Sequence, residues 1–154
     1  MQVEILELIL LISCRESDQN RTMILNVLEE PFASDGWRPA HAAAYGTFWS
    51  TERCLEVLIK GSPSGPAILE MKTAYGSTPA HIAAFSKHHT VENLNVIIRN
   101  APSGIGILQM KNDRGETPLD IASPEISKYF TPRRIKEIGL ELELRSLQRN
   151  YELE

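Results

Sequence analysis

Apolar residues recur at helical spacing in short segments, and each type of segment returns about forty residues later in the chain. In residues 90–100 they are three or four positions apart, which predicts a helix with one apolar face. Residues 55–61 (LEVLIKG) and 94–100 (LNVIIRN) share this pattern at an offset of thirty-nine. In residues 90–100, Val91, Leu94, Ile97 and Ile98 lie at helical spacing. The pattern predicts two equivalent amphipathic helices, the second of them capped by Thr90.

A second type of segment begins with glycine and occurs three times, as GWRPAHAAAY (36–45), GSTPAHIAAF (76–85) and GETPLDIASP (115–124). In the middle copy, Thr78 is an N-cap residue, and Pro79 fits the first helical position because its missing N–H would have no partner there. The alanines that follow predict a slender helix that can lie close to its neighbours. Each starting glycine indicates a tight turn.

The copies are separated by two slightly different distances. Gly36 and Gly76 are forty residues apart, whereas Gly76 and Gly115 are thirty-nine apart. Because PSGPAILEMK recurs as PSGIGILQMK at thirty-nine, the extra residue of the first unit falls between Ala44 and Leu55, where we expect a loop. Repetition at such a period predicts a stack of units that bury their apolar faces against one another.

The segment Thr-Pro-x-His-x-Ala-Ala after a glycine turn resembles the ankyrin repeat. The matching positions are Pro39, His41, Ala43 and Ala44 in the first unit, Thr78, Pro79, His81, Ala83 and Ala84 in the second, and Thr117, Pro118, Leu119 and Ala122 in the third. Arg38 replaces the threonine of the first unit, and Asp120 replaces the histidine of the third. The resemblance covers about residues 33–130. It implies an all-α, ankyrin-type helical solenoid with short β-turn or hairpin tips and capping helices at both ends.

The units depart from that family in length. Each is about six residues longer than the usual repeat of thirty-three. The extra length falls at SPSGPAILEMK (62–72) and APSGIGILQMK (101–111), where we expect the hairpins to stand on a longer stem. In the family, the motif histidine bonds the backbone and threonine of adjacent turns. The resemblance therefore gives His41 and His81 a structural role rather than a catalytic or metal-binding one.

The whole chain is expected to form a single domain. Its parts are an N-terminal capping helix pair (1–35), two repeats (36–75 and 76–114), a degenerate repeat (115–130) and a C-terminal helix (131–154). The apolar residues 1–13 predict a buried helix. The alternative is a cleaved leader, since Leu11–Cys14 is similar to a lipoprotein cleavage box, but no basic residue precedes Arg15. In the last helix, an apolar stripe at four-three-four spacing comprises Leu140, Leu144, Leu147 and Tyr151.

Composition and motifs narrow the function classes. A net charge of −4 does not fit a nucleic-acid binder, which needs a basic surface. The two cysteines, Cys14 and Cys54, lack metal-site spacing and indicate a reducing, intracellular compartment, with delivery into a host cell as an effector left open. No phosphate loop, nucleophile elbow or metalloprotease motif is present, and the pair His88-His89 lacks further ligands. We therefore expect no catalytic residue, cofactor, metal, membrane or small-molecule substrate.

The resemblance implies a protein-interaction module that binds a partner protein in the groove formed by the turn tips and the first helix of each unit. The predicted partner-binding residues are Asp35, Trp37, Tyr45, Tyr75, Ser77, Phe85, Asp113, Arg114 and Glu116. Aromatic residues there favour binding because they are enriched at interface hot spots. The sequence leaves open whether Tyr45 and Phe85 face the groove or pack between units. We expect a monomer, and the alternative is a scaffold that dimerises through the C-terminal helix.

Overall fold

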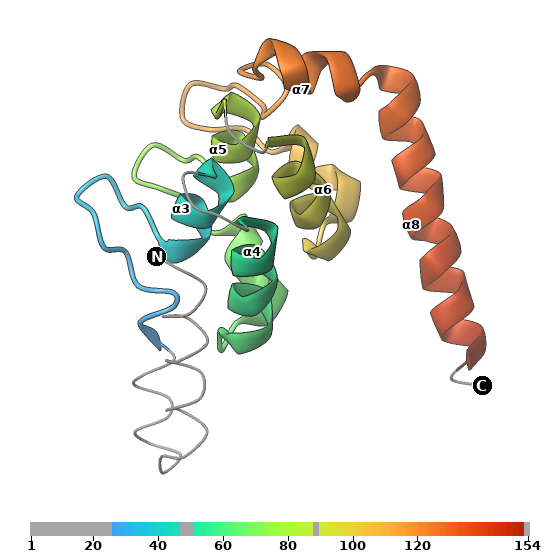
Figure 1. The fold of residues 1–154 in the computed structure, drawn as a ribbon, viewed down its shortest axis with the longest axis horizontal. Helices are drawn as coiled ribbons and strands as arrows, with labels where there is room; N and C mark the ends of the chain where they lie inside the picture. Colours follow the sequence, from blue (N-terminus) through green and yellow to red (C-terminus); the bar gives the residue numbers. More distant parts are fainter. Residues whose placement is uncertain (1–25, 47–50, 88–89, 153–154) are drawn as a thin grey trace.

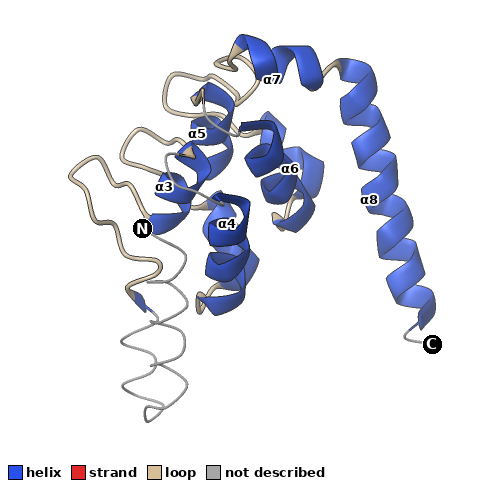
Figure 2. Ribbon diagram, viewed as in Figure 1, coloured by secondary structure: helices blue, strands red, loops and turns tan. Residues whose placement is uncertain are grey.

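The computed structural model describes residues 26–46, 51–87 and 90–152, and within these ranges the secondary structure is helical, with no strand. The all-α class predicted from the sequence is confirmed for this part of the chain (Figure 2). The elements are α3 (Pro39–Tyr45), α4 (Thr51–Gly61), η1 (Gly65–Glu70), α5 (Pro79–Phe85), α6 (Thr90–Asn100), η2 (Gly104–Gln109), α7 (Pro124–Tyr129) and α8 (Pro132–Glu152). Here η marks a 3-10 helix.

Two helical hairpins stack side by side. The pair α3 and α4 packs against the pair α5 and α6, with α3 on α5 and α4 on α6 (Figure 1). The close approach depends on small side chains, because the buried positions of α3 and α5 include Ala40, Ala43, Ala44, Ala80, Ala83 and Ala84. Five residues separate α3 from α4 and four separate α5 from α6, so the extra residue of the first unit lies between its helices, as predicted.

The extra length of each unit corrects one prediction. The segments expected to form a longer hairpin stem contain the 3-10 helices η1 and η2 instead. Each contributes two fully buried side chains to the core, namely Ile68 and Leu69 from η1 and Ile107 and Leu108 from η2. Each is also tied to the preceding unit, because the amide of Ser64 donates to Glu29 Oε1 (2.5 Å) and the amide of Ser103 donates to Glu70 Oε1 (2.8 Å).

The third unit closes the stack differently. Its first segment forms turns at residues 118–121 rather than a helix, and the helix starts predicted at Ser123-Pro124 and Thr131-Pro132 are confirmed as the starts of α7 and α8. Ile126 and Phe130 from α7 and its end, with Ile138 from α8, join the core. The helix α8 lies beyond α6 and packs on η2 (Figure 1).

Several predictions concern residues outside the described ranges. These are the N-terminal capping helix with its alternative leader, Cys14, and the pair His88-His89. Cys54 lies on α4 and is buried in the core. Among the described residues, no helix has both the length and the apolar character that a membrane crossing requires.

A hollow at the turn tips as the candidate functional site

Three turns project from the stack, and we call them the first tip (33–37), the second tip (73–77) and the third tip (112–116). In the second tip, the amide of Thr73 donates to the carbonyl of Ser77 (2.9 Å) and the amide of Gly76 donates to the carbonyl of Thr73 (3.0 Å). Gly76 has a φ of 73°, a left-handed conformation that glycine adopts without steric cost. The chain therefore reverses within five residues.

Backbone hydrogen bonds join each tip to the next. The amide of Ala74 donates to the carbonyl of Asp35 (2.8 Å), and the amide of Asp113 donates to the carbonyl of Tyr75 (3.1 Å). The three tips consequently form one row beside α3 and α5 (Figure 1). Side chains on this row have a fixed spacing, which is the property a binding surface needs to act without ordering cost.

The two motif histidines add a second link, from the first helix of each unit to the next tip. In the second unit, Nδ1 of His81 accepts a hydrogen bond from the amide of Thr78 (3.1 Å), so the ring proton is on Nε2, which donates to the carbonyl of Glu116 (3.0 Å). In the first unit, Nε2 of His41 lies 3.1 Å from the carbonyl of Ser77. The structural role expected for both residues is therefore observed.

Burial keeps these imidazoles neutral. Desolvation lowers the pKa of His41 to about 4, against an ordinary value of 6.5, although the hydrogen bond to Ser77 opposes the shift. The pKa of His81 is also lowered, again chiefly by burial. A neutral ring can accept at one nitrogen and donate at the other, which is the arrangement that both tips require.

The third unit keeps only half of this arrangement. Asp120 Oδ2 accepts from the amide (2.7 Å) and the hydroxyl (2.8 Å) of Thr117, as His81 accepts at Nδ1, and these bonds lower the pKa of Asp120. A carboxylate has no proton to donate to a following tip. The replacement of histidine by aspartate therefore coincides with the last tip in the row.

A hollow of about 520 Å³ opens between the second and third tips. It is lined by Tyr75, Ser77, His81, Ile82, Phe85, Asn112, Asp113, Arg114, Glu116 and Ile121. Ile82, Phe85 and Ile121 supply an apolar surface, while the side chains of the third tip supply charges of both signs. We call this site the tip hollow. A mostly apolar concavity with a few polar groups is the usual form of a binding site.

Serine stands at the tip hollow where the first unit has tryptophan. Trp37 and Ser77 occupy the same repeat position, as do Tyr45 and Phe85. The ring of Trp37 packs edge-on against Tyr45, with 5.8 Å between ring centroids, and Tyr45 is half-buried. Ser77 is too small to cover its neighbour, and Phe85 remains 65% exposed. Trp37 thus occupies, in the first unit, the space that remains open beside Ser77 in the second.

Six of the nine predicted partner-binding residues line the tip hollow, namely Tyr75, Ser77, Phe85, Asp113, Arg114 and Glu116. Asp35, Trp37 and Tyr45 belong to the first tip and α3 instead, where Asp35 Oδ1 accepts from the amide of Trp37 (3.2 Å). The sequence left open whether Tyr45 and Phe85 face the groove or pack between units. Phe85 is exposed at the hollow, whereas Tyr45 packs against Trp37 of its own unit.

Four residues that line the tip hollow were not among those predicted from the sequence. Ile82 and Ile121 occupy the same repeat position as Ala42, and this coincidence of two isoleucines beside the tips was an available signal. Asn112 shapes the third tip, since its Oδ1 accepts from the amides of Arg114 (2.9 Å) and Glu116 (3.0 Å). The fourth, His81, was assigned only to the stack.

Comparisons with known proteins identify no family for this chain. No model of a known protein family matches the chain, and no curated protein matches it. Within the described ranges, no group of three or more His, Cys, Asp or Glu side chains is placed to hold a metal ion.

Proposed function

We propose that this chain is a protein-interaction module of the ankyrin-repeat kind, which binds a segment of a partner protein at the tip hollow. One observation carries the proposal: Phe85 is uncovered at the position where Trp37 covers Tyr45 in the preceding unit. An apolar or aromatic side chain of a partner would bury the same kind of surface that Trp37 buries within the chain.

The surroundings of the hollow favour this use. Tyr75 is 68% exposed, so two large aromatic rings of one site are available to solvent. The hydrogen bonds between the tips fix the backbone that carries Tyr75, and α5 carries Phe85, so that binding does not have to order the backbone of the site. Asp113, Arg114 and Glu116 provide a charged rim, as protein interfaces commonly have. The proposal gives the chain no catalytic role.

A substitution that fills the hollow from within tests the proposal. Ser77→Trp gives the second unit the residue that the first already has, and we expect it to fold and to cover Phe85. Affinity capture from the native cells should then lose a partner that the parent chain retains, by at least tenfold. Ser146→Trp is the matched control, because Ser146 is exposed on α8 and distant in sequence from the tips. Equal capture by Ser77→Trp and the parent would contradict the proposal.

A probe of defined chemistry needs no partner. Indole, titrated into the parent chain, is expected to shift the methyl NMR signals of Ile82 and Ile121, which line the hollow. Ser77→Trp should abolish these shifts. Indole shifts that persist in this variant would place the binding elsewhere.

One observation favours a second candidate function, self-association through α8. The apolar stripe on this helix is exposed to solvent, at 52% for Leu140, 62% for Leu144, 55% for Leu147 and 78% for Tyr151. Its four-three-four spacing is that of a coiled-coil seam. Sedimentation equilibrium distinguishes the candidates: a dimer that Leu144→Glu dissociates supports the scaffold, and a monomer at all concentrations removes it.

A further inference from the structure

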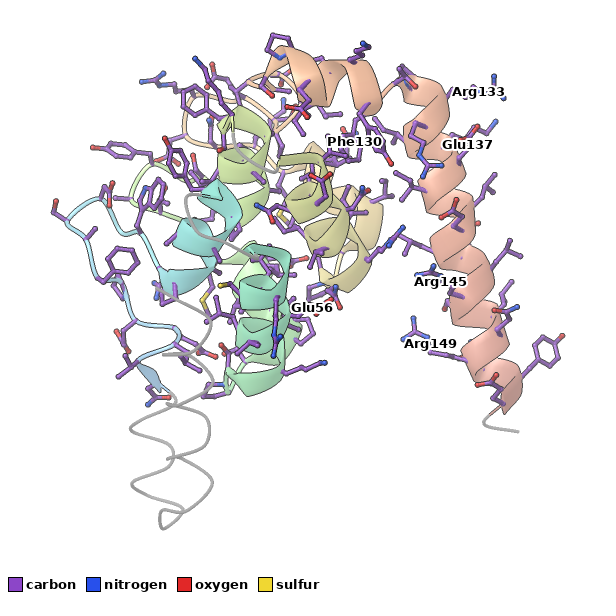
Figure 3. All side chains as sticks on the ribbon, viewed as in Figure 1. Glu56, Phe130, Arg133, Glu137, Arg145 and Arg149 are labelled. Carbon is purple, nitrogen blue, oxygen red and sulfur yellow. The ribbon has the colours of Figure 1, made fainter. Side chains whose placement is uncertain are left out.

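The side of α8 that faces the stack changes character along its length. Ile135, Ile138 and Leu142 follow one another at spacings of three and four, and Ile138 is 4% exposed. The same spacing continues to Arg145 and Arg149. Both arginines extend from α8 toward the side on which α6 lies (Figure 3). The helix therefore presents arginine, rather than an apolar side chain, to the end of α6.

These arginines share a second hollow with the end of α6. It measures about 460 Å³ and is lined by Arg99, Asn100, Arg145, Gln148, Arg149 and Glu152. We call it the arginine hollow. Three guanidinium groups from two helices face one carboxylate, so the site has an excess positive charge although the chain as a whole carries −4.

The three arginines form no ion pair with another described residue, in contrast to those at the start of α8. Arg133 Nε lies 3.1 Å from Glu137 Oε1. Arg134 Nη1 lies 3.4 Å from Glu137 Oε2 and 3.7 Å from Glu141 Oε1. Three positive charges beside a single carboxylate leave a net repulsion, and an anion bound between the guanidinium groups reverses the sign of that interaction.

We propose that the arginine hollow binds a phosphate-class anion, in the form of a diphosphate or a closely spaced pair of phosphoryl groups. Guanidinium groups pair with phosphate oxygens through two parallel hydrogen bonds. Gln148 offers amide N–H donors. Asn100 keeps a second N–H for the anion, because among the described residues its Nδ2 donates to the carbonyl of Val96 alone (2.8 Å). This set holds more donors than one carboxylate can accept, and a diphosphate can use them. The bound anion would join the second half of α8 to α6.

Calorimetric titration of the full chain with inorganic pyrophosphate, at constant ionic strength, tests the site. We expect saturable binding of one pyrophosphate per chain. Arg145→Gln and Arg149→Gln should each weaken it at least fivefold, and the double variant at least tenfold. Arg133→Gln is the matched control, because it removes the same charge from the same helix on the side turned away from the stack (Figure 3). Equal weakening by Arg133→Gln would overturn the proposal, as would absence of binding by the parent chain to pyrophosphate and to the vesicles described next.

Two further measurements identify the source of the phosphate and test the proposed bridge between α8 and α6. Vesicles of phosphatidylcholine with and without phosphatidylinositol bisphosphate distinguish a lipid headgroup from a free anion, and binding that depends on Arg145 and Arg149 in either form supports the site. Hydrogen exchange of the amides in residues 143–152 should slow at least threefold with pyrophosphate. Unchanged exchange at saturating pyrophosphate would contradict the bridge between α8 and α6.

Discussion

The Nε2 atom of His81 lies 3.0 Å from the carbonyl oxygen of Glu116, thirty-five residues further along the chain. This bond and its counterpart from His41 to Ser77 connect α5 and α3, respectively, to the following turn tip through neutral, buried imidazoles. The same residues that stabilise the stack thereby fix the spacing of the tips that border the tip hollow. Protonation of the imidazoles is therefore expected to weaken the stack and to disturb the spacing of the tips together.

Stability should fall as the pH is lowered from about 6.5 to about 4. An unfolded histidine takes up a proton near 6.5, whereas the folded pKa of His41 is about 4 and that of His81 is also lowered. The unfolded state therefore binds more protons than the folded state in this pH range. The contribution of the two histidines to stability is complete above pH about 6.5 and is lost as the pH falls. The shift of His41 alone corresponds to about 3 kcal/mol. Urea unfolding at several pH values measures this loss.

Carboxylates also titrate in this range, so His41→Gln serves as the comparison. This variant should be less stable than the parent at pH 7, and its stability should change less between pH 6.5 and 4. Parallel pH profiles for the two chains would show that His41 is not the group responsible.

Alanine in place of two turn glycines should have unequal effects. Gly76 and Gly115 have φ values of 73° and 77°, so an alanine at either position is strained by about 1–2 kcal/mol. A β-carbon on Gly76 would lie 2.9 Å from the backbone nitrogen of Asp113, whereas one on Gly115 meets nothing within 4 Å. Gly76→Ala should thus destabilise the chain by at least about 1 kcal/mol more, because the third tip must move. Equal melting temperatures of the two variants would contradict the close approach of the tips.

The helices of the repeats could be predicted because their signals are local. Thr78-Pro79 marks the start of α5, and the spacing of apolar residues in 90–100 defines α6. The conformation of residues 62–72 could not be predicted in this way, because no helical period runs through them. Ile68 and Leu69 of the 3-10 helix there are buried, and η1 packs against α5 and α6 of the next unit as well as against the preceding α4.

The position of the candidate site could be predicted from the sequence, but the arrangement of its side chains could not. Repeat units in register bring their turn tips together, which is why Tyr75 and Arg114 meet at one hollow. The sequence did not reveal that Trp37 would lie over Tyr45 rather than project from its tip. That outcome depends on side-chain direction, which the period of the repeat does not fix. The arginine hollow was missed because it joins α8 to α6 across the stack.

Enlarging a buried alanine of α5 should destabilise the stack. Ala83 is 0% exposed where α5 packs against its neighbours, so Ala83→Leu is expected to cost about 1–3 kcal/mol through overpacking. Ala67→Leu is the matched control, since Ala67 is exposed on η1 and a change there should remain within about 0.5 kcal/mol. If thermal denaturation gives Ala83→Leu the melting temperature of the parent, α5 is less closely packed than described.

Two truncations of α8 should differ in their effect on the fold. Every residue from 143 to 152 is exposed, so a chain that ends after Leu142 loses no core side chain. A chain that ends after Thr131 also loses Ile138, whose burial contributes about 1.5–3 kcal/mol, and uncovers the contact of α8 with η2. We therefore expect the shorter deletion to melt cooperatively near the parent's temperature and the longer one several degrees lower. The shorter deletion should nevertheless fail to bind pyrophosphate, because it lacks Arg145 and Arg149. A shorter deletion that unfolds would mean that the second half of α8 stabilises the stack, although its side chains lie in solvent.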